Sequence, residues 1–331
     1  MEVVRISSDC ISIALDLALE VFMEYEAPVY SQEGIDEFKS FIDANRVNSK
    51  LSFYGAYEVA ELVGMIAIRD YQHISLFFIK TAYQRKGIGR LIFNRVREDY
   101  EKQIFTVNSS PYAVDIYKRL GFMPISAERI TNGIKYTPMV LLESERLRLK
   151  RYEIDDFKAV YSIFSNPDTM KHYPHAFSKE ETINWINRNI KRYDDDGFGL
   201  WPVVLKSSGE VIGDCGITMQ NINGEMLPEI GYHIHEQYQG MGYASEAARL
   251  CIDYAFHSLN IPALYSYMKY TNVPSCRVAE KCGMTLIDEY HDPINIKTKV
   301  YCIKNRDKEW ISGFIKLLMF LFMHTTLPVY T

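Results

Sequence analysis

The feature that most constrains the fold is a glycine-bearing loop that occurs twice in the chain. Residues 82–90 and 237–244 each follow an apolar segment typical of a strand and precede apolar residues spaced as on one face of a helix. In such a loop, backbone N–H groups and the positive end of the helix dipole converge on one point. Glycine lets a ligand approach the backbone closely. Each loop therefore predicts a phosphate site, although an ordinary strand-to-helix turn has the same pattern.

A second motif follows each loop at a similar distance. In the first half, a predicted strand at residues 103–108 leads through a break to a short helix that stops at Gly121. In the second half, a predicted strand at residues 263–267 leads to a similar helix that stops at Gly283. Two motifs that recur in the same order indicate an internal repeat. We therefore expect two copies of one α/β domain in this chain of 331 residues.

At these residues the chain resembles the GCN5-related N-acetyltransferase (GNAT) superfamily. The family signature, Gln/Arg-x-x-Gly-x-Gly/Ala, is matched at residues 84–89 and 239–244. The resemblance implies two mixed α/β domains, each with a mostly antiparallel sheet that is splayed at its centre and flanked by helices. It also implies that the loop amides hold the pyrophosphate of acetyl-CoA and that the preceding strand pairs with the pantetheine arm. The expected cofactor contacts are Ile79, Gln84, Arg85, Lys86, Gly87, Ile88, Gly89 and Arg90, and then Ile234, Gln239, Gly240, Met241, Gly242, Tyr243, Ala244 and Asn272.

The two halves resemble different branches of this superfamily. The first resembles small bacterial GNAT proteins at residues 107–114 and 116–122. The second resembles the ribosomal-protein N-terminal acetyltransferase subgroup, at residues 145–149, 229–232, 242–247 and 272–275. The implied reaction is transfer of an acetyl group from acetyl-CoA to a primary amine, either a small molecule or a protein N-terminus. Two alternatives stay open: only one domain is catalytic, or the chain is an acetyl-CoA-binding sensor or scaffold.

Acetyl transfer to an amine requires a base for the amine and a proton for the departing thiolate. In the second half, the resemblance makes Glu229 the candidate base, and the alternative is a solvated glutamate at a strand end. Ser275 is the candidate acid or thiol contact, and it could instead cap the helix that follows. Asn272 is either a cofactor contact or a cap. The tyrosine that is common in the family is replaced here by Ala279.

The first half keeps this tyrosine as Tyr117, one helical turn before Gly121. Tyr117 is therefore the candidate acid of the first domain, and a core tyrosine is the alternative. No acidic residue occupies the position of the expected base. His73, a water molecule, and Glu24 or Glu26 from the predicted first helix are the possibilities that the sequence leaves open.

Composition bounds the remaining functions. The net charge of −5 gives no reason to expect nucleic-acid binding. The six cysteines lack metal-ligand spacing, so we expect no metal and reduced thiols. The N-terminus lacks the pattern of a signal sequence, which favours the cytoplasm. We place the domains at 1–142 and 143–305, and we expect them to pack together because only residues 143–145 join them.

The apolar stretch within residues 306–331 belongs to neither repeat. A helix packed on the protein, on a partner or in a homo-oligomer is the favoured interpretation. Disordered or atypical sequence is the second, and membrane attachment is the third, because the apolar run at residues 314–323 is short for a bilayer span. The sequence does not name the acceptor. In this family acceptor choice depends on variable loops, expected here at residues 25–32 and 172–178.

Overall fold

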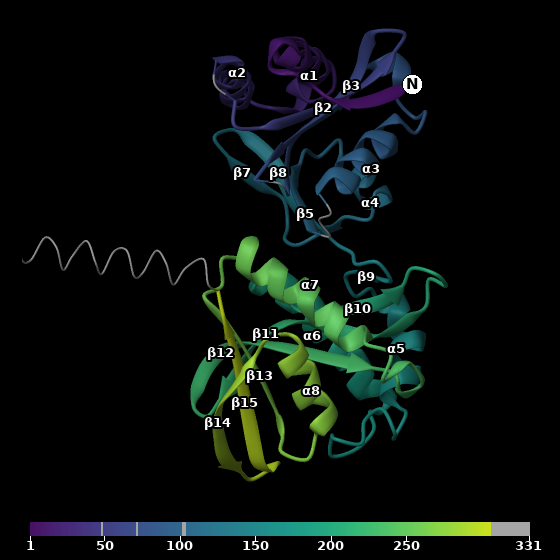
Figure 1. Ribbon diagram of the computed structural model, residues 1–331, viewed down its shortest axis with the longest axis vertical. Coiled ribbons are helices and arrows are strands. Elements are labelled where there is room, and N and C mark those ends of the chain that lie inside the picture. The colour runs from purple at the N-terminus through teal and green to yellow at the C-terminus, as the bar shows by residue number, and fades with distance from the viewer. Residues whose placement is uncertain (48, 71, 101–103, 306–331) are drawn as a thin grey trace, which may run out of the picture.

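The computed structural model describes residues 1–47, 49–70, 72–100 and 104–305, which form two sheets, one above the other in Figure 1. The predicted C-terminal tail, residues 306–331, lies outside the described residues. The first sheet is built from strands within residues 2–142 and the second from strands within residues 147–304. The predicted fold class, two mixed domains in tandem, is confirmed. The exact domain boundaries stay a prediction.

The first sheet has the strand order β1-β2-β3-β4-β5-β8-β6, and β7 pairs with β8. Its neighbouring strands are antiparallel except for β4 and β5, which are parallel. The strands are β1 (Glu2–Arg5), β2 (Ser52–Glu58), β3 (Glu61–Arg69), β4 (His73–Ile79), β5 (Ile104–Ser109), β6 (Met123–Pro124), β7 (Arg129–Thr131) and β8 (Ile134–Leu142).

The second sheet has the order β14-β15-β13-β12-β11-β10-β9 and again contains one parallel pair, β12 with β13. The strands are β9 (Leu147–Leu149), β10 (Leu200–Leu205), β11 (Val211–Ile222), β12 (Glu225–Ile234), β13 (Ala263–Lys269), β14 (Thr285–Asp292) and β15 (Ile296–Lys304).

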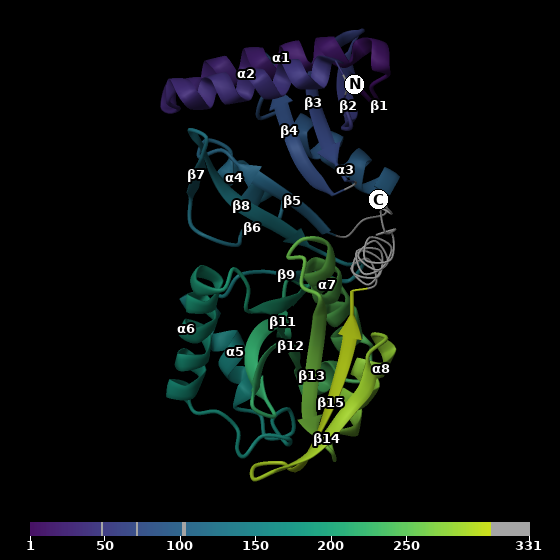
Figure 2. The same cartoon turned by 90° about the vertical axis from the view of Figure 1, so that its left-hand side faces the viewer.

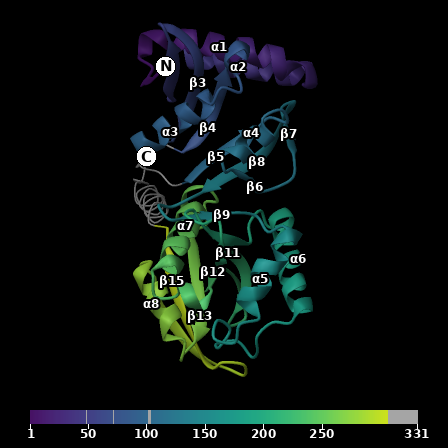
Figure 3. The ribbon, with the colours of Figure 1, turned by 90° about the vertical axis from the view of Figure 1, so that its right-hand side faces the viewer.

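Helices cover both faces of each sheet (Figures 2 and 3). Strand β3 shows why, because its apolar side chains are divided between two cores. Leu62, Met65 and Ala67 pack in the core beneath the helices at Ile11–Tyr25 and Gln32–Val47, and Val63, Ile66 and Ile68 pack in the core beneath the helix at Ile88–Tyr100. A strand that is buried on both faces needs such a nearly continuous apolar run. The helices are α1 (Ile11–Tyr25), α2 (Gln32–Val47), α3 (Ile88–Tyr100) and α4 (Val114–Arg119) in the first unit, and α5 (Phe157–Phe164), α6 (Lys179–Asp195), α7 (Tyr243–His257) and α8 (Val273–Lys281) in the second.

Each parallel pair is joined over a short stretch only, and the two strands then diverge. Strands β4 and β5 are paired only at His73–Thr106 and Ile74–Val107. Strands β12 and β13 are paired only at Glu229–Tyr265. This is the expected central splay, and it leaves backbone groups of the diverging strands free for a ligand. In both domains the glycine loop follows the first strand of the splayed pair.

The two domains share packing across their seam. Ile104, Val140 and Leu142 of the first sheet belong to the same apolar cluster as the core of the second domain. Glu143 and Ser144, which join the two domains, are buried although both side chains are polar. The Glu143 carboxylate is buried and its Oε2 lies 3.0 Å from Arg97 Nη2 and 3.5 Å from Lys206 Nζ. The domains are therefore packed together, as expected.

Three absences concern only the described part of the chain. No helix there is both long and apolar enough to cross a bilayer. No group of three or more His, Cys, Asp and Glu side chains there is arranged to hold a metal. The six cysteines are free thiols, although the Sγ atoms of Cys215 and Cys251 lie 3.7 Å apart in the second core.

Candidate active site

The two glycine loops are held by the same side-chain contact. In the first domain, Gln84 Nε2 donates a hydrogen bond of 3.1 Å to the carbonyl oxygen of Ile79, the last residue of β4. In the second, Gln239 Nε2 donates one of 2.9 Å to the carbonyl oxygen of Ile234, the last residue of β12. The glutamine of each signature therefore fixes its loop to the end of the preceding strand.

The backbone of the two loops also matches residue by residue. The residue after each glutamine has a left-handed φ, +59° at Arg85 and +79° at Gly240, and so does the third residue, +82° at Gly87 and +86° at Gly242. Glycine adopts these angles without steric cost. A Cβ built on Gly87 or Gly240 would meet no atom within 4 Å, so the space in front of these loops is open.

Helices α3 and α7 begin directly after Gly87 and Gly242. The first N–H groups of a helix have no partner within the helix, and the dipole places partial positive charge beside them. Open space, free amides and this charge suit a diphosphate. The residues present therefore fit the pyrophosphate of acetyl-CoA in both domains.

The second loop has an additional support. Arg146 Nε donates to Glu246 Oε2 at 2.7 Å, and Arg146 Nη1 donates to the carbonyl oxygen of Met241 at 3.2 Å. The same guanidinium lies over the Tyr243 ring, 4.4 Å from its centroid. Arg146, directly before β9, thus connects the start of the second domain to the glycine loop and to the first turn of α7.

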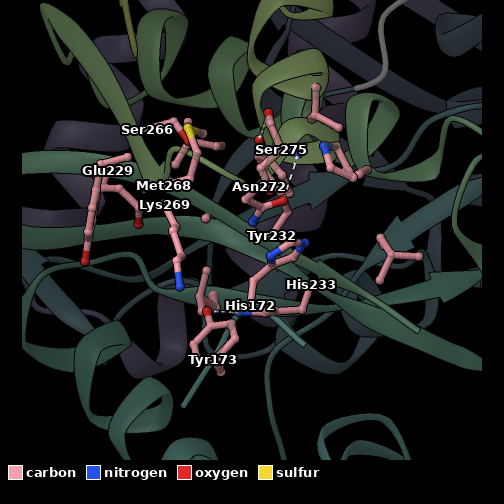
Figure 4. A pocket seen from close by; sticks show the side chains of 18 of the residues that line it. His172, Tyr173, Glu229, Tyr232, His233, Ser266, Met268, Lys269, Asn272 and Ser275 are labelled. Atoms are coloured by element: carbon pink, nitrogen blue, oxygen red, sulfur yellow. Dashed lines mark hydrogen bonds between the residues drawn. The ribbon is translucent and has the colours of Figure 1, made fainter. Parts of the chain in front are cut away.

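A cavity of about 1030 Å³ extends from this loop into the splay of the second sheet (Figure 4). Its lining includes Gln239, Gly240 and Gly242 on the side of the loop, and Asn272 and Ser275 from α8 and its cap. It also includes Glu229 at the splay point. The predicted cofactor and catalytic positions of the second domain are therefore brought together around one space.

Glu229 lies within β12, at the single residue pair that joins β12 to β13. The interpretation as a solvated strand end is therefore wrong. Its carboxylate accepts a hydrogen bond of 3.2 Å from Thr218 Oγ1. Burial raises the pKa of Glu229 to about 7, and the Thr218 hydrogen bond and nearby His233 and Arg192 only partly oppose this. A carboxylate with this pKa can accept a proton near neutral pH.

Asn272, not Ser275, caps α8. The Asn272 Oδ1 atom accepts a hydrogen bond of 3.3 Å from the backbone N–H of Ser275. The alternative that Ser275 is the cap is therefore wrong, and the cap interpretation of Asn272 is correct. Within the described residues no hydrogen bond involves the Ser275 hydroxyl, and the hydroxyl of Tyr232 donates to the Ser275 carbonyl at 2.9 Å.

A buried chain of polar groups beside Glu229 was missed by sequence reasoning. Asp214 on β11 is fully buried, and its Oδ1 lies 2.6 Å from His233 Nδ1. The Nε2 of the same imidazole is hydrogen-bonded to the hydroxyl of Tyr173. Asp214 Oδ2 also accepts hydrogen bonds from Tyr152 at 2.7 Å and from Trp185 at 2.9 Å. An aspartate within an apolar strand was the available signal, because a buried charge needs such partners.

In the first domain, Tyr117 on α4 is only 6% exposed and packs against the rings of Phe77 and Phe122. Burial raises the pKa of Tyr117, and the nearby charge of Glu26 raises it further. Glu26 follows the last residue of α1, and burial raises its pKa to about 7, which the nearby Ser110 side chain only partly opposes. The charge of Glu26 therefore acts on the Tyr117 phenol.

The other two candidate side chains for the first-domain base, His73 and Glu24, lack the combination of features found at Glu26. Burial lowers the pKa of His73 to about 4, and its Nδ1 lies 2.9 Å from Thr106 Oγ1 across the parallel strand pair. Glu24 accepts a hydrogen bond of 2.7 Å from Thr81 Oγ1 on the surface. Of the three, only Glu26 combines burial, a pKa near neutrality and proximity to Tyr117.

Comparisons with known proteins agree with this geometry. Two family models, both described as "Acetyltransferase (GNAT) domain", match residues 26–143 and 146–285. YkkB of Bacillus subtilis is 35% identical over 159 residues, which cover 47% of this chain and 92% of that protein. The N-acetyltransferase YnaD of the same organism is 33% identical over 144 residues, covering 43% of this chain and 81% of YnaD.

Among solved structures, a GNAT-family acetyltransferase from Bacillus anthracis aligns with a TM-score of 0.44 and 29% identity, covering 50% of this chain and 98% of that protein. The matches of both halves to the GNAT domain, together with relatives above 30% identity, show the family. The chain belongs to the GNAT family and is an acetyl-CoA-dependent N-acetyltransferase with two such domains in tandem.

Proposed function

We propose that the second domain is catalytically active and that Glu229 is its general base. The observation that carries this proposal is the position of Glu229: it has a pKa of about 7 and lies at the splay point, in the cavity that reaches the glycine loop. Acetyl-CoA supplies the thioester, and the chain must remove a proton from the acceptor ammonium. A carboxylate that is half ionised near neutral pH is suited to this transfer.

Ser275 is the proposed proton donor to the thiolate. Its hydroxyl makes no hydrogen bond within the described residues, and its backbone is fixed by Asn272 and Tyr232. Asn272 uses its side-chain oxygen for the cap, which leaves its NH₂ group for the proposed cofactor contact. The backbone amides of the splayed strands are available to stabilise negative charge on the thioester oxygen.

The chain from Asp214 through His233 to Tyr173 is proposed to position the acceptor loop. Tyr173 belongs to the segment at residues 172–178, where acceptor selection was expected. Its hydroxyl is tied to His233 on β12, and His233 is in turn tied to the fully buried Asp214. Tyr173 is thereby held in the wall of the cavity, near Glu229.

For the first domain we propose a second acetyl-transfer site with Glu26 as base and Tyr117 as acid. The electrostatic coupling of the two side chains supports this. The alternative is that this domain binds acetyl-CoA without catalysis. The near-complete burial of Tyr117 among phenylalanine rings favours the alternative. The resemblance of the second domain to the ribosomal-protein subgroup, and a cytoplasmic location, stay proposals as well.

A thiol-release assay with acetyl-CoA and a panel of amines and short peptides tests the proposal. The full chain is compared with Gly242→Val and Gly87→Val, because valine at a left-handed φ should deform the loop concerned. By calorimetry each variant should lose one of two acetyl-CoA sites, and Gly242→Val should also lose the turnover assigned to the second domain. Absence of acetyl-CoA binding by the unmodified chain would refute the proposal for both domains.

A further inference from the structure

The acceptor end of the second-domain cavity is lined by cations. We call Lys171, Arg188, Arg192 and Lys269 the cationic rim. Lys171 precedes α6, Arg188 and Arg192 lie on α6, and Lys269 ends β13. In Figure 4 the Lys269 side chain points into the cavity between Glu229 and the pair formed by His172 and Tyr173.

The members of this rim lack carboxylate partners. Across the described ranges of the chain, none of the four forms an ion pair. Arg192 Nη1 donates only to the amide oxygen of Asn189, at 3.2 Å, and Arg188 lies over the ring of Trp185 at 5.8 Å. Burial lowers the pKa of Arg192 and nearby Arg188 lowers it further, and the charges of Asp196, Glu229 and Asp214 oppose this only in part. A partly buried cation that no carboxylate contacts is only partly compensated, so these side chains are suited to an anionic ligand.

The carboxylates of the cavity do not balance these cations. Its lining contains two, Glu229 and Asp292. Asp292 accepts hydrogen bonds from the backbone N–H groups of Ile294 at 2.7 Å and Asn295 at 3.2 Å, so it is engaged in its own turn. Glu229 carries only part of a charge near neutral pH, because burial raises its pKa to about 7. Positive charge therefore predominates.

The cofactor alone does not explain the rim. Both domains have the same cofactor loop, yet the charged side chains close to Tyr112 and Tyr117 of the first domain are two carboxylates, Glu24 and Glu26, and one cation, Arg85 of the glycine loop itself. A requirement of acetyl-CoA would be shared by both domains. None of the four rim residues belongs to the glycine loop: they lie on α6, on β13 and in the segment before α6, next to the loop expected to select the acceptor.

We propose that the second domain acetylates amines that also carry an anionic group, a carboxylate or a phosphate, and that Lys269 and Arg192 bind this group. The inference rests on the proposed function of the site. An anion held by the rim would place the amine of the same molecule near Glu229. A polyamine would meet like charges there, and such juxtaposition opposes binding.

Matched acceptors test this proposal. The full chain carrying Gly87→Val is assayed for thiol release with methionine against methioninamide, and with phosphoethanolamine against ethanolamine. Spermidine is the polycationic comparison. The anionic member of at least one pair should have a kcat/KM about 10-fold or more above its neutral counterpart, since hydrogen bonds to charged groups are the stronger ones. A preference for methionine over methioninamide alone identifies a carboxylate as the anionic group that is recognised. A preference for phosphoethanolamine over ethanolamine alone identifies a phosphate.

Substitutions in the cationic rim test whether these residues bind the anionic group of the acceptor. Lys269→Met should reduce the preference about 10-fold, and Lys171→Met, at an exposed side chain, should reduce it less. Lys299→Met is the matched control, because Lys299 lies on the neighbouring strand β15 and faces Glu289 instead of the cavity. It should leave the preference unchanged. Equal or better use of the neutral acceptors, or of spermidine, would overturn the proposal, and so would a preference that survives Lys269→Met.

A binding measurement distinguishes failure of this inference from failure of the proposed function. The CoA-saturated chain is titrated calorimetrically with methionine, methioninamide, phosphoethanolamine and ethanolamine. Tighter binding of an anionic member, lost in Lys269→Met, supports the inference even if none of the four is acetylated. Binding without such preference overturns it, as does absence of binding by all four. Failure of every amine in the broader panel to release thiol would refute the proposed function instead.

Discussion

Arg146, directly before β9, and Glu246, in the first turn of α7, form an ion pair in which Arg146 Nε lies 2.7 Å from Glu246 Oε2. The same guanidinium donates to the Met241 carbonyl within the glycine loop. Glu246 also accepts a hydrogen bond from the Ser144 hydroxyl at the domain joint. The shape of the second cofactor loop is therefore coupled to the seam between the domains.

Arg146→Met should weaken acetyl-CoA binding at the second domain about 10-fold, because it removes a charge-assisted hydrogen bond from the loop. The first site should keep its affinity, so a calorimetric titration should separate into two unequal sites. Arg95→Met is the matched control: Arg95 is similarly exposed and pairs with Asp99 on α3, away from the second loop. Equal weakening of both sites by Arg146→Met would contradict this role.

The architecture could be predicted from the sequence because its signals are local. The glycines at 87 and 242 mark backbone angles that other residues adopt at a cost, and Tyr117 is recognisable by its spacing from Gly121. Because these signals occur twice in the same order, they predict two domains. Each such signal depends on a few neighbouring residues only.

The polar network around the cavity could not be predicted, because its members meet only in three dimensions. Asp214, His233 and Tyr173 come from β11, β12 and a loop, and no spacing in the chain connects them. Arg146 was noticed as part of a motif, but its contact with Met241 crosses 95 positions of sequence. The position of Glu26 in an expected acceptor loop can be predicted from the sequence, but the burial that raises its pKa cannot.

Glu229→Gln should depress turnover at the second domain by about 10² to 10⁴. In the parent chain carrying Gly87→Val, kcat/KM should fall as the pH drops below about 7, because Glu229 is then protonated and cannot accept a proton. The glutamine variant should lack this dependence, and its acetyl-CoA affinity should stay close to that of the parent. An unchanged rate and pH profile would mean that another group is the base.

Glu229 should also lower the stability of the fold at high pH. Its pKa is about 7 when folded and about 4.5 when unfolded, so the folded state holds the proton more tightly. Its favourable contribution is complete below pH 4.5 and is lost as the pH rises through 7. Glutamine has no such loss and can still accept the hydrogen bond from Thr218.

The stability gained by Glu229→Gln should therefore increase between about pH 5 and pH 8, up to about 3 kcal/mol from the size of the pKa shift. Urea unfolding of both proteins at a series of pH values measures the difference, and Glu289→Gln serves as a control. The hydrogen bond with Lys297 holds the pKa of Glu289 below its usual range, so this carboxyl is ionised throughout the pH range of the experiment. A difference between Glu229→Gln and parent that stays constant with pH would show that the Glu229 pKa is not raised.

The catalytic status of the first domain depends on Tyr117 and Glu26. Residues 1–142 alone are a poor test, since Ile104, Val140 and Leu142 are buried against the second domain. The full chain carrying both Gly242→Val and Glu229→Gln isolates the first site. If that chain still acetylates an amine, Glu26→Gln should remove the pH dependence near 7, because burial raises the pKa of this carboxyl to that value.

In the same background, Tyr117→Phe should bind acetyl-CoA normally and lose turnover by about 10² to 10⁴, since phenylalanine keeps the packing against Phe77 and Phe122 and removes only the proton. A good thiolate leaving group would place the loss at the lower end of this range. Tyr100→Phe is the control, because Tyr100 packs on the Tyr54 ring at the far end of α3. If the chain binds acetyl-CoA at the first site but acetylates no amine, Tyr117 is a core residue and the domain is regulatory. Activity that survives Tyr117→Phe would identify an enzyme with a different acid.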